Sequence, residues 1–355
     1  MASARRYDSS VDSKRITERL DASQKEDIAR AAAILRSGGT VAFPTETVYG
    51  LGANALSAEA VEKIFFAKQR PHWDPLIVHV CDLDMLAQVA TTTLHPTARK
   101  LIEKFWPGPL TVLLPRTHAI PDAVTAGRPL VGVRMPAHPV ALQLIREAGI
   151  PIAAPSANTF GHISPTTAAH VLADLDGRID AILDGGPTTV GLESTVVEID
   201  DLGVIIYRPG GVSLESLCSI QDIGWVRTHT PELSNQEPES LPSPGVGIRH
   251  YAPRAQLVLI PTEAEPDSDV LLGAMAEGKK QGKSVGVMLP DGWALLPGCS
   301  FFPWGPWDEP ETLAQRLYTG LRDLDARPIE LILCPVPPDG GIGQAIRDRL
   351  TKAAR

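Results

Sequence analysis

The stretch TVAFPTETVYGLGANALSAEAVEKIFFAKQRPHWDPLIVH, residues 40–79, decides the fold. An apolar run near its start, residues 41–43, predicts a strand. The amphipathic segment 58–68 predicts a helix, because its apolar residues recur at helical spacing. A second apolar run at 76–80 predicts another strand. Strand, helix and strand in this order predict an α/β domain.

Polar side chains gather where these elements end. Thr47 lies in the turn after the first strand, Lys68 and Arg70 lie at the end of the helix, and the second strand carries His79. Cations at a helix C-terminus also complement the helix dipole, which is an explanation that needs no ligand. A hydroxyl, two cations and an imidazole on neighbouring segments favour the other reading, a site for a small anion.

The alternation of strands and helices continues to about residue 212, which predicts one α/β domain with a twisted, open, mixed sheet. Ser23 is the expected N-cap of the first helix, and Gly38 follows its end. The predicted helices are 23–37, 97–106, 138–148 and 166–175, and the further strands are 110–114, 130–135, 151–155, 180–184, 196–199 and 204–207.

More candidate site residues follow the later strands. Arg134 lies inside an apolar strand, where a cation is costly unless it is paired or faces a cavity. An edge-strand salt bridge would explain it, but a guanidinium is also suited to clamping a carboxylate. Short hydrogen-bonding groups and one more cation lie after other strands or at a helix start: Ser156, Asn158, Ser164, Ser194 and Arg208.

Composition shifts divide the rest of the chain. Residues 1–22 are polar and are predicted to be a disordered tail before a first domain over 23–212. A segment rich in Pro, Glu, Ser and Thr predicts a linker over 213–253. Beyond it, 254–355 predicts a second, smaller α/β domain. Its expected strands are 256–260, 284–289 and 329–334, and its expected helices are 268–282, 310–325 and 341–353.

Composition also limits the class of protein. The 355 residues carry a net charge of -9, which gives no global basic field for nucleic acid. Four cysteines are scattered without a CxxC pair, which argues against a zinc site or a disulfide scaffold and suits a reducing compartment. No apolar run approaches the ~20 residues of a membrane span. We therefore expect a cytoplasmic protein without a membrane partner.

The candidate residues indicate positioning chemistry. No catalytic triad, metal cluster or phosphate-binding P-loop is present, and GLGAN at 50–54 lacks the Lys that a P-loop needs. Cations and hydroxyls together predict a site for a nucleotide polyphosphate beside a small carboxylate. Mg²⁺ is expected to arrive with the phosphates, and no protein side chain is assigned to it.

Six motifs in order resemble a known family. They are PTETVYGLG (44–52), AKQRP (67–71), PLIVH (75–79), APSAN (154–158), ESTVV (193–197) and YRPG (207–210). They are similar to the YrdC-like domain of the threonylcarbamoyl-AMP synthase family. The linker end SPG…RHYAP (243–253) and the second domain resemble the long, two-domain form, and the likeness covers about 24–355.

The resemblance implies a reaction and its partners. L-threonine, bicarbonate and ATP would give threonylcarbamoyl-AMP and pyrophosphate, with Mg²⁺ bound to ATP. The product would pass to a separate transferase that makes threonylcarbamoyladenosine (t6A) beside the tRNA anticodon, with at most weak tRNA contact by this chain. The implied fold is a twisted open sheet with a concave basic face, a small Rossmann-like second domain, and a linker that can cover the site.

The resemblance also implies roles for single residues. Threonine would be held by Thr47, His79, Arg134, Ser194 and the main chain of Ala154. ATP would be held by Arg70, Ser156, Ser164 and Arg208, with Lys68 and Asn158 completing two motifs, and Lys68 and Arg70 are the expected catalytic cations. Asp74 replaces an Asn common in this loop, so it would bring negative charge near the phosphates unless it faces Mg²⁺ or makes a main-chain contact. Tyr251 or His250 of the linker is expected to reach the nucleotide.

Three alternatives stay open from the sequence. A carbamoyltransferase-like protein is disfavoured because the zinc-finger CxxC pairs of such proteins are absent. An RNA-binding or ribosome-maturation module is disfavoured by the acidic balance, although a local basic groove would still permit it. A regulatory protein would bind ATP without turning it over.

Overall fold

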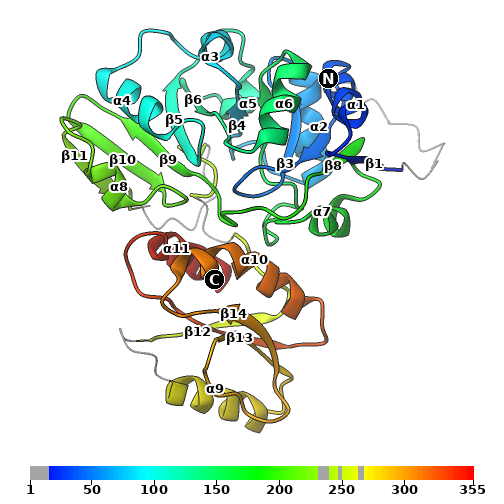
Figure 1. Cartoon of the computed structure of the whole chain (residues 1–355), viewed down its shortest axis with the longest axis vertical. Coiled ribbons are helices and arrows are strands. Elements are labelled where there is room, and N and C mark those ends of the chain that lie inside the picture. The colour runs from blue at the N-terminus through cyan, green and yellow to red at the C-terminus, as the bar shows by residue number, and fades with distance from the viewer. Residues whose placement is uncertain (1–15, 231–239, 247–249, 263–267) are drawn as a thin grey trace, which may run out of the picture.

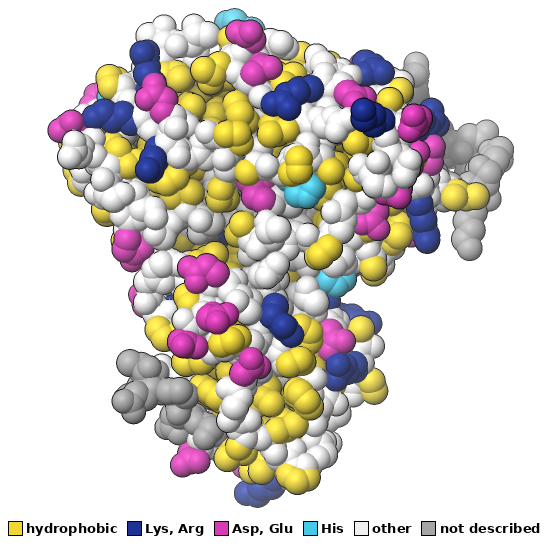
Figure 2. Space-filling view, in the orientation of Figure 1, with side chains coloured by type: hydrophobic (Ala, Val, Ile, Leu, Met, Phe, Trp, Pro, Cys, Tyr) yellow, Lys and Arg dark blue, Asp and Glu magenta, His cyan; other side chains and the backbone are white. Residues whose placement is uncertain are grey.

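The computed structural model describes residues 16–230, 240–246, 250–262 and 268–355 as two lobes joined at a narrower waist (Figures 1 and 2). The first domain holds the following elements: β1 (Glu18–Asp21), α1 (Lys25–Arg36), β2 (Val41–Phe43), β3 (Gly50–Asn54), α2 (Ala58–Lys68), β4 (Ile77–His79), α3 (Leu83–Val89), α4 (Pro96–Phe105), β5 (Leu110–Pro115), α5 (Asp122–Thr125), β6 (Leu130–Arg134), α6 (Pro139–Ala148), β7 (Ile152–Ala153), α7 (Ala168–Leu175), β8 (Ala181–Asp184), β9 (Thr195–Ile199), β10 (Gly203–Arg208), α8 (Leu214–Cys218) and β11 (Trp225–Thr228).

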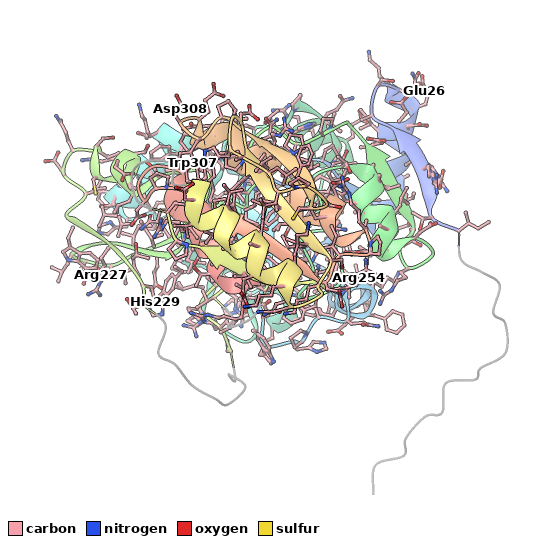
Figure 3. All side chains as sticks on the ribbon, turned by 90° about the horizontal axis from the view of Figure 1, so that it is seen from below. Glu26, Arg227, His229, Arg254, Trp307 and Asp308 are labelled. Atoms are coloured by element: carbon pink, nitrogen blue, oxygen red, sulfur yellow. The ribbon has the colours of Figure 1, made fainter. Side chains whose placement is uncertain are left out.

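One mixed sheet of eleven strands runs through this domain in the order β1-β8-β2-β3-β7-β4-β6-β5-β9-β10-β11. The sheet contains parallel pairs, such as β4 with β6, and antiparallel pairs, such as β5 with β6. Figure 3 shows Arg227 of β11 and the neighbouring His229 on the opposite side of the molecule from Glu26 of α1, as this order requires. The predicted fold class, a twisted mixed α/β sheet, is confirmed.

Most of the predicted features of residues 40–79 are present in the structure. The Ser57 hydroxyl accepts a hydrogen bond from the Ala60 N–H and so caps α2, as predicted. Gln69 adopts a left-handed conformation with φ of 54° and ends the helix there, which turns Arg70 back toward the sheet. The glycine-rich segment after the Thr turn forms strand β3, which pairs antiparallel with β2. This strand was missed, because glycine is uncommon in strand interiors.

The predicted N-terminal tail over 1–22 is wrong for residues 18–21. These residues form β1, which pairs in parallel with β8 and buries Leu20. Their partner strand lies about 160 positions further along the chain, so local sequence carries no sign of the pairing. The N-cap of α1 is Gln24, not Ser23, and it makes no side-chain capping bond. Residues 1–15 lie outside the described part of the chain.

The predicted linker over 213–253 begins too early. Helix α8 and strand β11 still belong to the first domain, because Leu217 and Ile223 are buried in its core and β11 pairs in parallel with β10. Residues 240–246 and 250–253 are the described parts of the connection that follows, and residues 231–239 and 247–249 lie outside the description.

The second domain is a four-stranded parallel sheet in the order β12-β15-β13-β14. Helices α10 and α11 lie between this sheet and the first domain, and α9 covers the opposite face (Figures 1 and 3). Strand β14 was missed, because its segment SFFPWG contains Pro303. The elements are β12 (Gln256–Ile260), α9 (Ser268–Lys280), β13 (Val285–Pro290), β14 (Ser300–Gly305), α10 (Pro310–Asp325), β15 (Leu331–Pro335) and α11 (Gly343–Ala353). In the described residues, no helix combines the length and apolar character that a bilayer span needs.

Candidate active site

One cavity collects residues from several separate segments of the chain. Arg70, Arg134 and Arg208 all line it, although they lie on or next to different strands and helices. The space open to water inside it is about 50 Å³. The remaining lining residues among those predicted are Thr47, His79, Ala154, Ser156, Ser194, His250 and Tyr251.

Arg134 ends β6 with its side chain 4% exposed, and each of its nitrogens has a neighbour. Nε donates to the Gly108 carbonyl at 3.1 Å, and Nη1 donates to the Thr47 hydroxyl at 2.9 Å. Nη2 lies 2.5 Å from a carboxylate oxygen of Glu46. The guanidinium is therefore fixed in place and neutralised from behind, while its cavity side stays open to a carboxylate.

His79 lies beside Arg134 because β4 and β6 pair in that register. Its ring is buried, and Nδ1 has no hydrogen-bond partner among the described residues. Burial, and then the Arg134 charge, lower the pKa of His79 to about 3. The imidazole is consequently neutral at pH 7, and Nδ1 is free to exchange a hydrogen bond with a ligand in the cavity.

Arg208 and Ser194 form the next part of the wall. Arg208 donates from Nε to the Ser194 carbonyl and from Nη2 to the Ser194 hydroxyl, both at 3.0 Å. Gly210 follows on the same turn, and a Cβ there would lie 2.3 Å from the Glu193 carbonyl oxygen. Only glycine fits this close approach of the two segments. Within the described ranges, no carboxylate lies in ion-pair distance of Arg208.

Asp74 does not line the cavity. Its carboxylate forms a buried ion pair with Arg70 at 2.9 Å, and its carbonyl accepts from Arg70 Nε at 3.1 Å. The Pro75 carbonyl accepts from Arg70 Nη2 at 2.8 Å. The position predicted to meet ATP thus lies behind Arg70, where it orients the guanidinium and offsets part of its charge.

Replacing Asp74 by Asn is expected to tighten anion binding. The two backbone acceptors would still hold Arg70, while the charge that offsets it would be gone. We expect the Kd for inorganic pyrophosphate to fall about tenfold, the effect of roughly 1.4 kcal/mol of electrostatic energy. Isothermal titration calorimetry measures this, with the exposed Asp122→Asn as the matched control. An unchanged or higher Kd in D74N would show that Asp74 does not screen Arg70.

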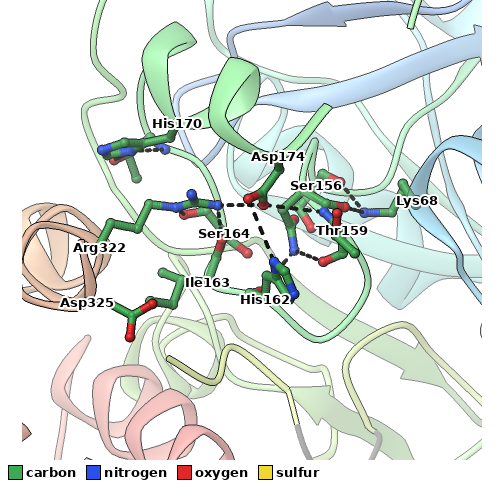
Figure 4. Close-up of polar contacts among 12 residues, drawn as sticks. Lys68, Ser156, Thr159, His162, Ile163, Ser164, His170, Asp174, Arg322 and Asp325 are labelled. Carbon is green, nitrogen blue, oxygen red and sulfur yellow. Dashed lines mark hydrogen bonds and ion pairs between the residues drawn. The ribbon is translucent and has the colours of Figure 1, made fainter. Parts of the chain in front are cut away.

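Lys68, Asn158 and Ser164 lie behind the wall of the cavity. The Lys68 ammonium donates to the carbonyls of Ser156 and Asn158, both at 2.5 Å (Figure 4). The Asn158 amide donates to the carbonyls of Thr159 and His162. Burial, and then the nearby Arg70 charge, lower the pKa of Lys68 well below its usual value. These residues shape the loop that presents Ser156, and Lys68 has no direct path to the cavity in this conformation.

The connection between the domains closes the cavity. Its residues Pro244, Gly245, His250 and Tyr251 all line the space. Gly245 has φ of 78°, and a Cβ there would come within 3.0 Å of both Arg208 and the Tyr251 hydroxyl. Glycine is required at this position by its conformation and by the crowding around it. The predicted approach of His250 and Tyr251 to the site matches this placement.

Comparison with known proteins shows to which family the chain belongs. Residues 33–210 match the family described as "Telomere recombination", and residues 212–355 match "Threonylcarbamoyl-AMP synthase, C-terminal domain". The threonylcarbamoyl-AMP synthase of Bacillus subtilis is 43% identical over 341 residues, 96% of each chain. The chain belongs to the threonylcarbamoyl-AMP synthase family. The predicted identity and synthase function, a nucleotidyltransferase-type enzyme of tRNA processing, are thereby confirmed.

Two more relatives cover nearly the whole chain. The threonylcarbamoyl-AMP synthase of Pyrococcus abyssi is 41% identical over 91% of this chain and 93% of its own. A crystal structure of P. abyssi Sua5 complexed with L-threonine superposes with a TM-score of 0.85 at 38% identity, covering 96% of this chain and 97% of that one. The two-domain arrangement of this family member is therefore shared with a solved structure of the family.

Sequence reasoning missed three residues of this family member's site. Glu46 and Glu193 are buried carboxylates that lie inside two quoted motifs and pair with arginines. The rule that buried Arg needs a counter-ion could have drawn attention to them. The partner of Glu193 is Arg349 of α11, 156 residues away. No local pattern marks Arg349, because an amphipathic helix carries many arginines on its solvent face.

Proposed function

We propose that the reaction of this family member takes place in the cavity between Arg134 and Arg208. L-threonine would lie at the Arg134 end and the ATP triphosphate at the Arg70 and Arg208 end. The observation that carries this proposal is that all three arginines line one space, with short hydroxyl groups between them. Two anionic ligands bound side by side need several cations in one space.

At the Arg134 end, the threonine carboxylate would meet the open edge of the guanidinium and the Ser194 hydroxyl. The neutral His79 imidazole would exchange a hydrogen bond with the threonine hydroxyl or amine through Nδ1. Thr47 is already bound to Arg134 and would fix the guanidinium's plane. The main chain of Ala154, which also lines the cavity, would complete this end.

At the other end, Arg70, Arg208 and Ser156 would contact the triphosphate. Lys68 and Asn158 would act from behind, by holding the loop that carries Ser156, and Ser164 would act through its hydrogen bond to Glu193. Ligand pockets usually enclose ~300–1,000 Å³, and the space here is about 50 Å³. The connecting segment around Tyr251 would therefore have to move aside when the substrates enter.

The chemistry that this arrangement supports needs no enzyme nucleophile. The threonine nitrogen would form a bond to the bicarbonate carbon, with loss of water, to give a carbamate. A carbamate oxygen would then bond to the α-phosphorus of ATP, and the bond to pyrophosphate would break. Arg70 and Arg208 would stabilise the charge that develops on the phosphates, and Arg134 would hold threonine in position.

Mg²⁺ would arrive with ATP and add positive charge at its phosphates. In the described residues, no cluster of three His, Cys, Asp or Glu is arranged to hold a metal ion. The Glu193 oxygens accept from Ser164, Tyr318 and Arg349, and Asp74 is paired with Arg70. The site therefore fits an ion held by phosphate oxygens and water, not one held by carboxylates.

We further propose that the product passes to a separate transferase that places threonylcarbamoyl groups on tRNA in the cytoplasm. Weak contact of this chain with tRNA would suffice. The face seen in Figure 2 supports this, because acidic and basic side chains are interspersed on it and form no broad basic field. All four cysteines are free, which fits a reducing compartment.

Pyrophosphate release tests the proposed reaction. The purified chain with threonine, bicarbonate, ATP and Mg²⁺ is expected to release pyrophosphate, and omission of threonine or bicarbonate is expected to stop the release. Mass spectrometry should detect threonylcarbamoyl-AMP in stoichiometric amounts. Release that continues at an equal rate without threonine would indicate simple ATP hydrolysis and would contradict the proposal.

A further inference from the structure

The carboxylate of Glu193 joins the cavity to the second domain. Glu193 lines the cavity two residues before β9 and is 6% exposed. Ser164 donates to its Oε1 at 2.6 Å, from the same domain. Tyr318 of α10 and Arg349 of α11 donate to its Oε2 at 2.9 and 2.7 Å. Two of its three partners therefore come from the domain that contributes no residue to the cavity lining.

Arg349 reaches three segments of the site at once. Its side chain is 1% exposed. Besides Glu193, Nη2 donates to the Pro209 carbonyl at 2.9 Å, next to Arg208. Its guanidinium carbon lies 5.2 Å from the ring centroid of Tyr251, over the connecting segment. One side chain of α11 thus touches the loops that carry Ser194, Arg208 and Tyr251.

Neighbouring residues of α10 and α11 strengthen this contact. Lys352 donates to the Gly245 carbonyl at 2.8 Å, and the Tyr318 ring stacks on Tyr251 with centroids 5.7 Å apart. Arg322 binds Asp174 at 3.0 Å and the Ile163 carbonyl, as Figure 4 shows. The second domain therefore holds both the closing segment and the loop that leads to Ser164.

The charge of Glu193 makes Arg349 necessary. A carboxylate on the wall of a cavity for anionic ligands repels them unless it is neutralised. Burial alone favours the uncharged acid, but Arg349, and then Arg208, outweigh burial and hold the pKa of Glu193 at about 2. Without Arg349, burial would raise this pKa, and Glu193 would be an unpaired anion at any pH above its new value.

We propose that Arg349 is a positioning residue for the synthase reaction, which neutralises Glu193 and holds it against Ser164. The ATP end of the cavity is then complete only when α11 is in place on the first domain. This inference rests on the proposed function, since it places the triphosphate near Arg208, which lines the cavity together with Glu193. It assigns the second domain a direct part in nucleotide binding through one ion pair.

The test uses the full chain with Arg349→Met, Arg349→Lys and the double variant Glu193→Gln/Arg349→Met. Arg347→Met is the matched control, because Arg347 lies on the same helix and donates to Pro337 within its own domain. The measurements are kcat and KM for ATP from pH 6 to 9, and far-UV circular dichroism melts. Wild-type pyrophosphate release is measured first, so that failure of the proposed function is seen separately.

We expect R349M to raise KM for ATP about 10- to 100-fold. Its kcat/KM should also fall with rising pH, since the pKa of Glu193 rises and more of the unpaired carboxylate is charged as the pH increases. The double variant should lose this pH dependence and recover at least part of the KM, because the amide carries no charge. R349K should lie between R349M and wild type and show no such pH dependence, and R347M should match wild type.

Two results would overturn the inference while leaving the proposed function intact. One is an R349M enzyme with wild-type KM for ATP. The other is a double variant as impaired as R349M, with the same flat pH profile in both, which would mean that Arg349 acts only by holding the domains together. Should R349M fail to fold, R349K and Glu193→Gln are compared instead, and a wild-type KM for ATP in both would likewise refute the role.

Discussion

Replacing Arg134 by Met is expected to abolish threonine-dependent pyrophosphate release and to destabilise the fold. Arg134 is the cation at the threonine end, and its loss should lower kcat/KM for threonine about 10³-fold. The same change leaves Glu46 as a buried carboxylate without its counter-ion. Breaking such a pair costs about 3–5 kcal/mol of unfolding free energy. Urea unfolding and the pyrophosphate assay measure the two effects separately.

The double variant Glu46→Gln/Arg134→Met separates binding from stability. Removing the unpaired charge of Glu46 should recover most of the unfolding free energy. The activity should stay lost, because no guanidinium faces the substrate. Arg99→Met serves as the control, since Arg99 is an exposed arginine on α4. Activity in the double variant above one tenth of wild type would show that Arg134 does not bind threonine.

Replacing Arg208 by Met is expected to lower activity without lowering stability. Arg208 is 5% exposed, and the described residues place no carboxylate within ion-pair distance of it. Burial is the largest influence on its pKa and lowers it, so the charge is costly to keep in the fold. Removing it should leave the unfolding free energy equal to wild type or higher. The kcat/KM for ATP should still fall about 10²- to 10³-fold, since a cation facing the triphosphate is gone.

Thermal melts and ATP kinetics of the same R208M preparation check this contrast, with R99M again as the control. If Arg208 mainly held the loop that carries Ser194, R208M would lose both stability and activity. A large loss of stability in R208M, with KM for ATP unchanged, would therefore contradict its assignment to the phosphates. Together, R134M and R208M distinguish a cation neutralised by the protein from one left for the ligand.

Features of the first domain could be predicted from the sequence where contacts within a single helix or strand determine them. Ser57 caps α2 because its hydroxyl meets the N–H three residues later, and this is visible in the letters alone. Arg134 was predicted either to be paired or to face a cavity, because an apolar strand does not tolerate a bare cation, and in the structure it does both. Both arguments depend on residues within one element, and both placements agree with the structure.

Long-range pairing set the limit of prediction. Strand β1 exists only because β8 offers it a parallel partner, and β14 forms although Pro303 interrupts its sequence. Lys68 and Asp74 were assigned to ATP from motif position, yet both lie behind the cavity wall because nearby carbonyls and Arg70 hold them. The Glu193–Arg349 pair had no local signal at all.

The distance between Glu193 and Arg349 has a consequence during synthesis of the protein. A ribosome that adds about 5–20 residues per second needs roughly 8–30 s to make the 156 positions that separate them. Throughout that interval the nascent first domain contains Glu193 but lacks Arg349, which neutralises it in the complete protein. We therefore expect the nascent enzyme to bind ATP weakly until α11 has emerged from the exit tunnel and Arg349 can pair with Glu193.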